Sequence, residues 1–499
     1  MGGLHLSRRQ VLAALGACGL VGAAGCSAGR VGEPAAQRSG PRPAPPPGPP
    51  GWVLARRFSF GPTPDLVELA GRGPDAFLDH QLDPGLAEDP AVASLLAAIG
   101  AGSAGSTGVG EASARGADPE RRRAAVRSVV AGTVATAAWS SGQVRAVMAD
   151  FLADHLHVSI AEAPTVFFVP SYDAGVIRTR ALGSFAELLV ASARSAAMLV
   201  YLDNARSRAD GGRTPNENYA RELMELHTVG VDGGYDEADV VEVAHVLSGW
   251  SLQRPAATFT FRDAWHAPGP LAGGGEVLGW RPSRGGEADG EDLLHHLARH
   301  PSTARFVTWK LARRFVADDI APTDDLVVRL ADVYRRSDTV LAPVIREMAG
   351  PVAGAGSPAA KLRRPLDLVA AMLRMGSVTP NPSEFAASAR GVAHHLQGLG
   401  QVPYLWPAPN GYPETAGPWS GAGSVIARWK AAGAAAAGFG GLTPRPVPDD
   451  PTPTGVATSL LGAGPGPALA RALGRIGHDP DPVVAARAIT FASPEFQLR

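Results

Sequence analysis

Cysteine, an excess charge of one sign and strand-like patterns are scarce in this chain of 499 residues. The two cysteines, Cys18 and Cys26, both lie within the first 30 residues, so the rest of the chain can form no disulfide, no thiolate metal site and no cysteine nucleophile. The 46 basic residues are balanced by 47 acidic ones, which gives a formal net charge of −1. No strong positive field is available to hold a phosphate backbone, and we do not expect nucleic acid as a partner.

Glycine and proline are abundant instead, with 60 and 44 residues. Their combined share is well above that of an average globular protein, which predicts long loops or linkers. Residues 27–51 have few apolar side chains to bury and many prolines, so we expect a disordered, extended tether there. A second stretch, 100–118, is rich in glycine, serine and alanine and is expected to be a surface insertion.

The N-terminus has the pattern of an export signal. Arg8 and Arg9 precede an apolar run, Val11–Gly25, which is too short to span a membrane. The arginine pair resembles that of a twin-arginine signal, and the four residues ending at Cys26 resemble the lipobox of bacterial lipoproteins. We therefore expect acylation of Cys26, which would leave the protein on the outer face of the cell membrane. Ordinary cleavage in this region would instead leave a soluble secreted protein, and cleavage before Cys18 would leave an apolar run at the lower limit of length.

The remaining residues, 52–499, show mainly helical periodicity. Apolar residues recur three and four positions apart in 143–155, 182–199, 215–229, 237–247, 303–315, 325–334, 365–375 and 385–396. The clearest strand pattern is 257–261, which could pair with 276–279 across a loop rich in glycine and proline. We expect a mainly α protein with one large multi-helix body and a minor β-hairpin.

The segment 214–230 contains the most informative of these helices. Thr214 is expected to cap the helix, with Pro215 in its first turn, Glu217 completing a capping box and Gly230 ending it. We interpret Glu217, Arg221 and Glu225 as surface ion pairs.

A helical projection of the same segment places two polar residues, Asn216 and His227, on the apolar face with Tyr219 and Leu223, while Glu222 lies at its edge. Both a structural hydrogen-bond network and a functional pocket would explain two polar side chains facing the core.

A second helix follows, with Asp236 as its expected cap and Asp239 three residues later. Together the two helices cover 216–250, and this stretch closely resembles the signature of an uncharacterised bacterial family, domain of unknown function 1800. Other segments resemble the same family in the expected order: 57–63, 151–159, 176–183, 265–266, 303–306, 310–315, 364–366, 409–413 and 493–496. The resemblance implies export, a mainly helical body and genomic proximity to sulfatase-like exported proteins. It implies no known activity.

The chain departs from the family pattern at several positions. Leu152 stands where the family tends to have tryptophan, and Thr179 and Arg180 stand where it tends to have proline and histidine. Ala267 and Leu271 replace a common aspartate and lysine. If those positions form a catalytic or metal site, this member has an altered one.

Motifs for known chemistry are missing from the body. It has no zinc-binding His-Glu-x-x-His and no phosphate-binding loop. His155 and His157 could ligate a metal with Asp154, but two residues apart on one helix they point in different directions. We therefore expect no metal and no cofactor.

Two classes of function remain. The first is an accessory or scaffold protein of the cell envelope, acting with a sulfatase-like exported protein. The second is an envelope hydrolase with a pocket around His155, Asn216, Glu222 and His227, where a histidine beside a carboxylate could transfer protons. The absence of a recognisable nucleophile favours the first class.

Overall fold

The computed structural model describes residues 48–100, 119–161, 164–267, 275–354, 360–446, 450–476 and 480–499. All of these residues belong to one compact unit. The expected export signal at 1–26, the tether up to residue 47 and most of the expected insertion, 101–118, lie outside the described residues.

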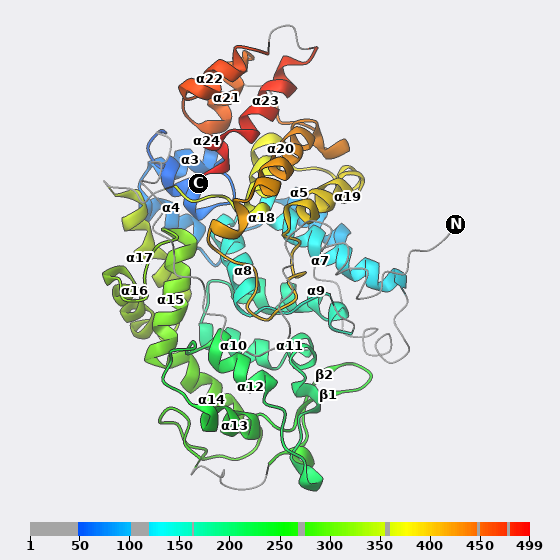
Figure 1. Cartoon of the computed structure of the whole chain (residues 1–499), viewed down its shortest axis with the longest axis vertical. Coiled ribbons are helices and arrows are strands. Elements are labelled where there is room, and N and C mark those ends of the chain that lie inside the picture. The colour runs from blue at the N-terminus through cyan, green and yellow to red at the C-terminus, as the bar shows by residue number, and fades with distance from the viewer. Residues whose placement is uncertain are drawn as a thin grey trace. The chain divides into compact units, whose positions relative to one another are not determined.

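The described part is mainly α-helical, as the sequence predicts (Figure 1). The helices of the first half are α2 (Trp52–Phe58), α3 (Pro64–Gly71), α4 (Pro74–Gln81), α5 (Pro90–Ile99), α7 (Pro119–Trp139), α8 (Gln143–His155), α9 (Val169–Tyr172), α10 (Phe185–Ala193), α11 (Ala196–Tyr201), α12 (Asn218–Glu222) and α13 (Glu237–Val246). Those of the second half are α14 (Glu287–Arg299), α15 (Pro301–Phe315), α16 (Asp325–Arg336), α17 (Leu341–Ala353), α18 (Pro365–Gly376), α19 (Pro382–Leu399), α20 (Ala422–Ala436), α21 (Pro453–Leu461), α22 (Pro467–Leu473), α23 (Pro482–Ala492) and α24 (Pro494–Gln497). Two π-helical turns, η2 (Asp173–Arg178) and η5 (Leu223–His227), continue α9 and α12. Short 3-10 turns are η1 (Thr165–Phe167), η3 (Asn204–Arg206), η4 (Asp210–Gly212), η6 (Asp263–Trp265), η7 (Gly417–Trp419) and η8 (Gly438–Gly440).

Many of the prolines begin helices. Proline is the first residue of α3, α4, α5, α7, α15, α18, α19, α21, α22, α23 and α24. Its fixed φ suits the first helical turn, and its missing N–H has no intrahelical partner there in any case. The high proline content therefore serves helix starts as well as the loops and linkers that composition predicts.

The single two-stranded sheet of the described residues differs from the predicted hairpin. Strand β2 (Thr258–Phe261) pairs antiparallel with β1 (Trp250–Gln253), and Trp250 lies opposite Phe261. The expected partner, 276–279, instead forms an isolated bridge between Val277 and Trp280. The predicted pairing is wrong because β1 follows α13 almost directly and is only four residues from β2, so it closes the shorter hairpin.

The helix predicted over 182–199 is divided in two by serine caps. The hydroxyl of Ser184 accepts the N–H of Glu187 at the start of α10, and that of Ser195 accepts the N–H of Met198 at the start of α11. Each cap satisfies a donor that an uninterrupted helix would bond internally, which favours a new helix start. The capping box predicted at Asp236 and Asp239 is confirmed for α13.

The helix predicted from Pro215 begins later than expected, because α12 starts at Asn218 and has no side-chain cap at Glu217. It then widens into the π-turn η5, so residues after Glu222 no longer keep the phase of an ideal α-helix. The predicted Thr214 cap and Glu217 capping box are therefore wrong.

The core is built around helices with almost no solvent-facing side. All residues of α18 are buried, and α18 packs against α7, α19 and α20.

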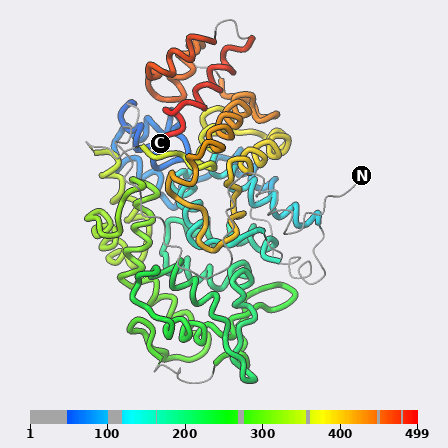
Figure 2. The backbone as a smooth tube through the Cα atoms, in the orientation of Figure 1, coloured from blue at the N-terminus to red at the C-terminus, as the bar shows by residue number. Residues whose placement is uncertain are grey.

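Figure 1 shows α20–α24 gathered at one end of the described part and α10, α12–α14 and the hairpin at the other, while α8, α15 and α18 lie between them. The tube in Figure 2 traces the first helices and the last residues of the chain into the same neighbourhood, where the Arg56 guanidinium donates to the carbonyl oxygen of Glu495 at 3.0 Å. None of the described helices is both long and apolar enough to cross a membrane.

Candidate functional site

The predicted residue His155 ends α8 in a buried, aromatic environment. Its ring lies parallel to that of Phe151, with the centroids 5.9 Å apart. Its Nε2 is 3.1 Å from the carbonyl oxygen of His227, and its Nδ1 is 3.0 Å from the Lys310 ammonium. A carbonyl requires a donor and an ammonium supplies one, so the proton of the neutral ring sits on Nε2. Both ring nitrogens of His155 therefore have protein partners.

His227 is fully buried, as the sequence predicts, but the hydrogen bonding of its ring differs from that of His155. Neither ring nitrogen has a hydrogen-bond partner among the described residues. Burial, with the charge of Lys310 and neighbouring His157, lowers the pKa of His227 to about 3. The imidazole is thus neutral at physiological pH. A buried polar ring without a partner is unfavourable and calls for an explanation such as a water or a ligand.

His157 is the third buried histidine of this region. Its ring stacks on that of Tyr404, and its Nε2 is 2.9 Å from the carbonyl oxygen of Trp406. Burial lowers the pKa of His157 to about 4. We refer to His155, His157, His227 and the adjoining Lys310 as the histidine cluster.

The other two predicted residues lie elsewhere. Glu222 is half-buried at the end of α12, where burial and the nearby charge of Glu225 raise the pKa of its carboxyl to about 7. No hydrogen bond or ion pair among the described residues joins it to His155 or His227.

Asn216 is exposed, so its predicted place on the buried face is wrong. It precedes α12 rather than sharing the helix, and its Oδ1 accepts the N–H of Asn218 at 2.9 Å. The predicted surface pairing of Arg221 is confirmed, since its guanidinium contacts Glu217 at 3.2 Å and Glu237 at 2.5 Å.

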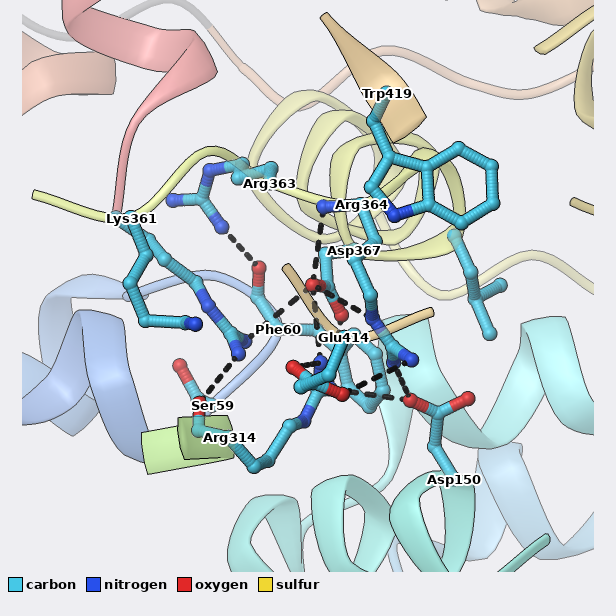
Figure 3. A network of polar contacts seen from close by, with 12 residues as sticks. Ser59, Phe60, Asp150, Arg314, Lys361, Arg363, Arg364, Asp367, Glu414 and Trp419 are labelled. Carbon is cyan, nitrogen blue, oxygen red and sulfur yellow. Dashed lines mark hydrogen bonds and ion pairs between the residues drawn. The ribbon is translucent and has the colours of Figure 1, made fainter. Parts of the chain in front are cut away.

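A second polar cluster, which sequence reasoning missed, lies in the interior (Figure 3). Arg314 on α15 reaches three carboxylates: Asp367 at 2.9 Å, Asp150 at 3.1 Å and Glu414 at 3.2 Å. Its side chain is completely buried.

Arg364, directly before α18, repeats the pattern. It contacts Asp154 at 2.9 Å and Glu414 at 3.2 Å, and it also pairs with Asp150. Arg499 adds a third guanidinium, 3.6 Å from Asp367. We call these seven residues the ion cluster: Asp150, Asp154, Arg314, Arg364, Asp367, Glu414 and Arg499.

The pKa values of the carboxyls in the ion cluster diverge. Burial alone would raise the pKa of Glu414, but Arg314, Arg364 and Lys361 outweigh burial and lower it to about 2. The same opposition holds the pKa of Asp367 well below its usual range. Burial prevails at Asp154, where Arg364 offsets only part of it and the pKa is raised to about 7. Neighbouring carboxyls with pKa values pushed apart are a pattern of acid–base sites and also of structural ion networks.

Several of the segments that carry the family resemblance meet at this cluster. Arg363, next to Arg364, donates to the carbonyl oxygens of Phe60 in the first segment and Phe496 in the last. The backbone N–H of Tyr412 donates to Asp154 at 3.3 Å. Gly411 has a φ of +67°, and a Cβ there would lie 2.1 Å from the carbonyl oxygen of Asp154, so this close approach requires glycine.

Two adjoining cavities open beside the ion cluster. The inner one, about 20 Å³, is bordered by Asp150, Asp173 and Arg178 and has room for a single water. The outer one, about 240 Å³, lies between α5, α7 and α8 and shares Arg178 with the first. Neither is lined by the predicted residues His155, Glu222 or His227.

No group of three or more histidine, cysteine, aspartate or glutamate side chains in the described part of the chain is arranged to hold a metal ion.

One sequence signal indicates the ion cluster that sequence reasoning missed. Asp150 and Asp154 lie four residues apart in an otherwise apolar stretch of α8, and like charges at that spacing repel each other unless cations lie between them.

A family model for a protein of unknown function (DUF1800) matches residues 53–498. The chain therefore belongs to this uncharacterised family, as its motifs indicate. No curated protein and no solved structure matches it.

Proposed function

We propose that this protein is exported, anchored to the outer face of the cell membrane by acylated Cys26, and acts there as an accessory or scaffold protein. Its partner would be a sulfatase-like exported protein, which the family resemblance implies. The arginine pair, the short apolar run and the lipobox-like residues before Cys26 support the export and anchoring steps.

The observation that carries the scaffold role is the pairing of the interior charges. The three guanidiniums of the ion cluster all face carboxylates of the same chain, which come from α8, the start of α18 and the loop at Glu414. Both ring nitrogens of His155 also have partners within the protein. These groups fix distant segments to one another, as expected of a rigid body that presents surfaces to partners.

The anchor is tested by labelling cells with an alkyne fatty acid and determining the mass of the mature N-terminus. Cys26→Ser should abolish the label, whereas Cys18→Ser, the matched control, should leave it unchanged. Retained acylation of the Cys26→Ser protein would overturn the proposal. Replacing both Arg8 and Arg9 by lysine should leave the precursor inside the cell, and unchanged export would point to the general secretory route.

The partner is tested by chemical cross-linking in intact cells followed by affinity purification of the wild-type protein. The expected result is recovery of a sulfatase-like exported protein that the Arg8→Lys, Arg9→Lys double variant, held inside the cell, does not capture. Equal recovery with this variant would contradict partnership in the envelope.

The second candidate, an envelope hydrolase, is favoured by two observations. The buried imidazole of His227 has no partner among the described residues, and Glu222 in the adjoining helix titrates near neutrality. A substrate or water at His227 would complete such a site. If His227→Leu folds with wild-type stability but fails to complement a deletion strain, the hydrolase is supported over the scaffold.

A further inference from the structure

One face of α20 exposes apolar side chains to solvent. Val425, Ile426 and Trp429 are 38%, 54% and 58% exposed. They lie at positions i, i+1 and i+4 of one helix, so their side chains form a continuous strip. Three of the six large hydrophobic residues that are exposed in the described part of the chain fall within these five positions.

The rest of this face is almost without charge. Its other exposed residues are Ala422, Gly423, Lys430 and Gly433, and α20 contains no aspartate or glutamate. The opposite face packs on α18 and α23, where Ala431 and Ala435 are buried and Arg428 bonds Gln497. A surface helix of a water-soluble protein normally has a charged outer face, so an outer face that is mainly apolar indicates a second apolar contact.

We propose that the exposed face of α20 lies in the interface of a lipid bilayer. Tryptophan is enriched at that depth because its ring is apolar and its N–H polar, while Ile426 and Val425 would reach the start of the acyl chains. Lys430 would face anionic headgroups, and no carboxylate of α20 opposes them.

This inference deepens the proposed function and rests on the anchor at Cys26. Twenty-one residues, 27–47, separate that cysteine from the first described residue. A proline-rich segment of this length spans about 65 Å at about 3.1 Å per residue. The tether would therefore keep the body near the membrane and still let α20 turn toward it. Because the body is held close to the lipid, burial of a small apolar area on α20 is enough for contact.

The area of the strip distinguishes a membrane from a second copy of this chain. The exposed parts of the three side chains amount to roughly 300 Å² of apolar surface. A stable dimer interface buries about 800 Å² on each partner, more than this strip provides. Insertion into a bilayer has no such requirement, because each buried side chain contributes separately.

The test uses the mature wild-type protein in vesicles whose lipids carry bromine on the acyl chains, which quenches nearby tryptophan. We expect clear quenching of the wild type and loss of most of it in Trp429→Phe. Trp406→Phe is the matched control and should quench as the wild type does, because Trp406 lies outside α20 and bonds Asn410. Equal quenching of the wild type and Trp429→Phe would overturn the proposal.

A second measurement separates failure of this inference from failure of the anchor. The mass of the N-terminus reports acylation whether or not α20 touches lipid. Acylated protein is reconstituted into the vesicles, whereas unacylated protein is added to preformed vesicles. The Ile426→Ser, Trp429→Ser double variant should lose quenching in either format, whereas Val231→Ser, an exposed apolar control elsewhere, should not. If sedimentation instead shows that the wild type is a dimer and the double variant a monomer, the face is a protein interface and the lipid proposal is wrong.

Discussion

The ion cluster and the histidine cluster share two helices, α8 and α15, yet they accommodate buried polar groups in opposite ways. Helix α8 supplies Asp150 and Asp154 to the first and His155 to the second, and α15 supplies Arg314 to the first and Lys310 to the second. The ion cluster keeps its charges and pairs them. The histidine cluster remains largely uncharged, because burial and Lys310 both oppose protonation of His155 and His227.

The two clusters differ in how many partner residues they require from other segments of the chain. Ion pairs in the interior are stable only when every charge has a partner, so the ion cluster must collect residues from segments far apart in sequence. Neutral imidazoles need fewer partners, and the ring of His227 has none among the described residues. The ion cluster is therefore suited to hold the fold together, whereas His227 is the buried group that is open to a water or ligand.

Removal of a charge from the ion cluster should have the largest effect. Arg364→Ala leaves Asp154 and Asp150 without one of their cations in a buried site, which typically costs about 3–5 kcal/mol of unfolding free energy. Chemical denaturation of the purified protein measures this change.

The control for that measurement is Arg221→Ala. Arg221 also contacts two carboxylates, but at the surface, where such pairs contribute less than about 1 kcal/mol. A loss of similar size in the two variants would show that the ion cluster is no more important to stability than a surface pair.

Acid should act on the buried histidines and on Asp154 of the ion cluster with opposite sign. The pKa of His227 is lowered to about 3 and that of His157 to about 4, so the folded protein stays unprotonated there while unfolded histidine takes up protons below about 6.5. Stability should therefore fall with falling pH from about 6.5 toward 4, by about 1.4 kcal/mol per pH unit for each histidine. The pKa of Asp154 is raised to about 7, so its contribution is present at low pH and is lost as pH rises toward 7.

Unfolding free energies measured between pH 4 and 7 separate these contributions. His227→Leu should flatten the rise of stability with pH, whereas Asp154→Asn should steepen it. Parallel curves for the wild type and His227→Leu would mean that His227 is protonated in the folded state, against the lowered pKa on which this prediction depends.

The sequence predicts much of the fold but only part of either cluster. Helix periodicity gives the bounds of α8 correctly, and the cap at Asp236 is read from a local pattern. Burial of His227 also follows from periodicity, because it lies on the apolar side of its helix. Asn216 does not follow, since the late start of α12 depends on packing that no local pattern encodes.

The ion cluster is harder to predict for a physical reason. Arg314 and Asp367 are 53 residues apart, and Arg314 and Asp150 are 164 apart, so their pairing is decided by tertiary packing. Arginines near aspartates and glutamates along a sequence are usually solvated surface residues. Only the like charges of Asp150 and Asp154 on an apolar helix give a local indication that cations must approach.

Paired leucine substitutions should give the smallest effects and the sharpest contrast within the histidine cluster. His155→Leu removes a ring whose two nitrogens bond the carbonyl oxygen of His227 and the Lys310 ammonium, which leaves a buried acceptor unsatisfied and should cost about 1–3 kcal/mol. His227→Leu removes a ring of similar size that makes no hydrogen bond to the described residues, and the carbonyl that accepts from His155 is retained. It should change the unfolding free energy by less than about 1 kcal/mol and could stabilise the fold, because no desolvated nitrogen remains. Thermal and denaturant unfolding of the two variants measure these changes. If His227→Leu lowers the unfolding free energy as much as His155→Leu does, a tightly held water already satisfies the His227 ring. His227 would then be a structural group, and the observation that favours a hydrolase would be removed.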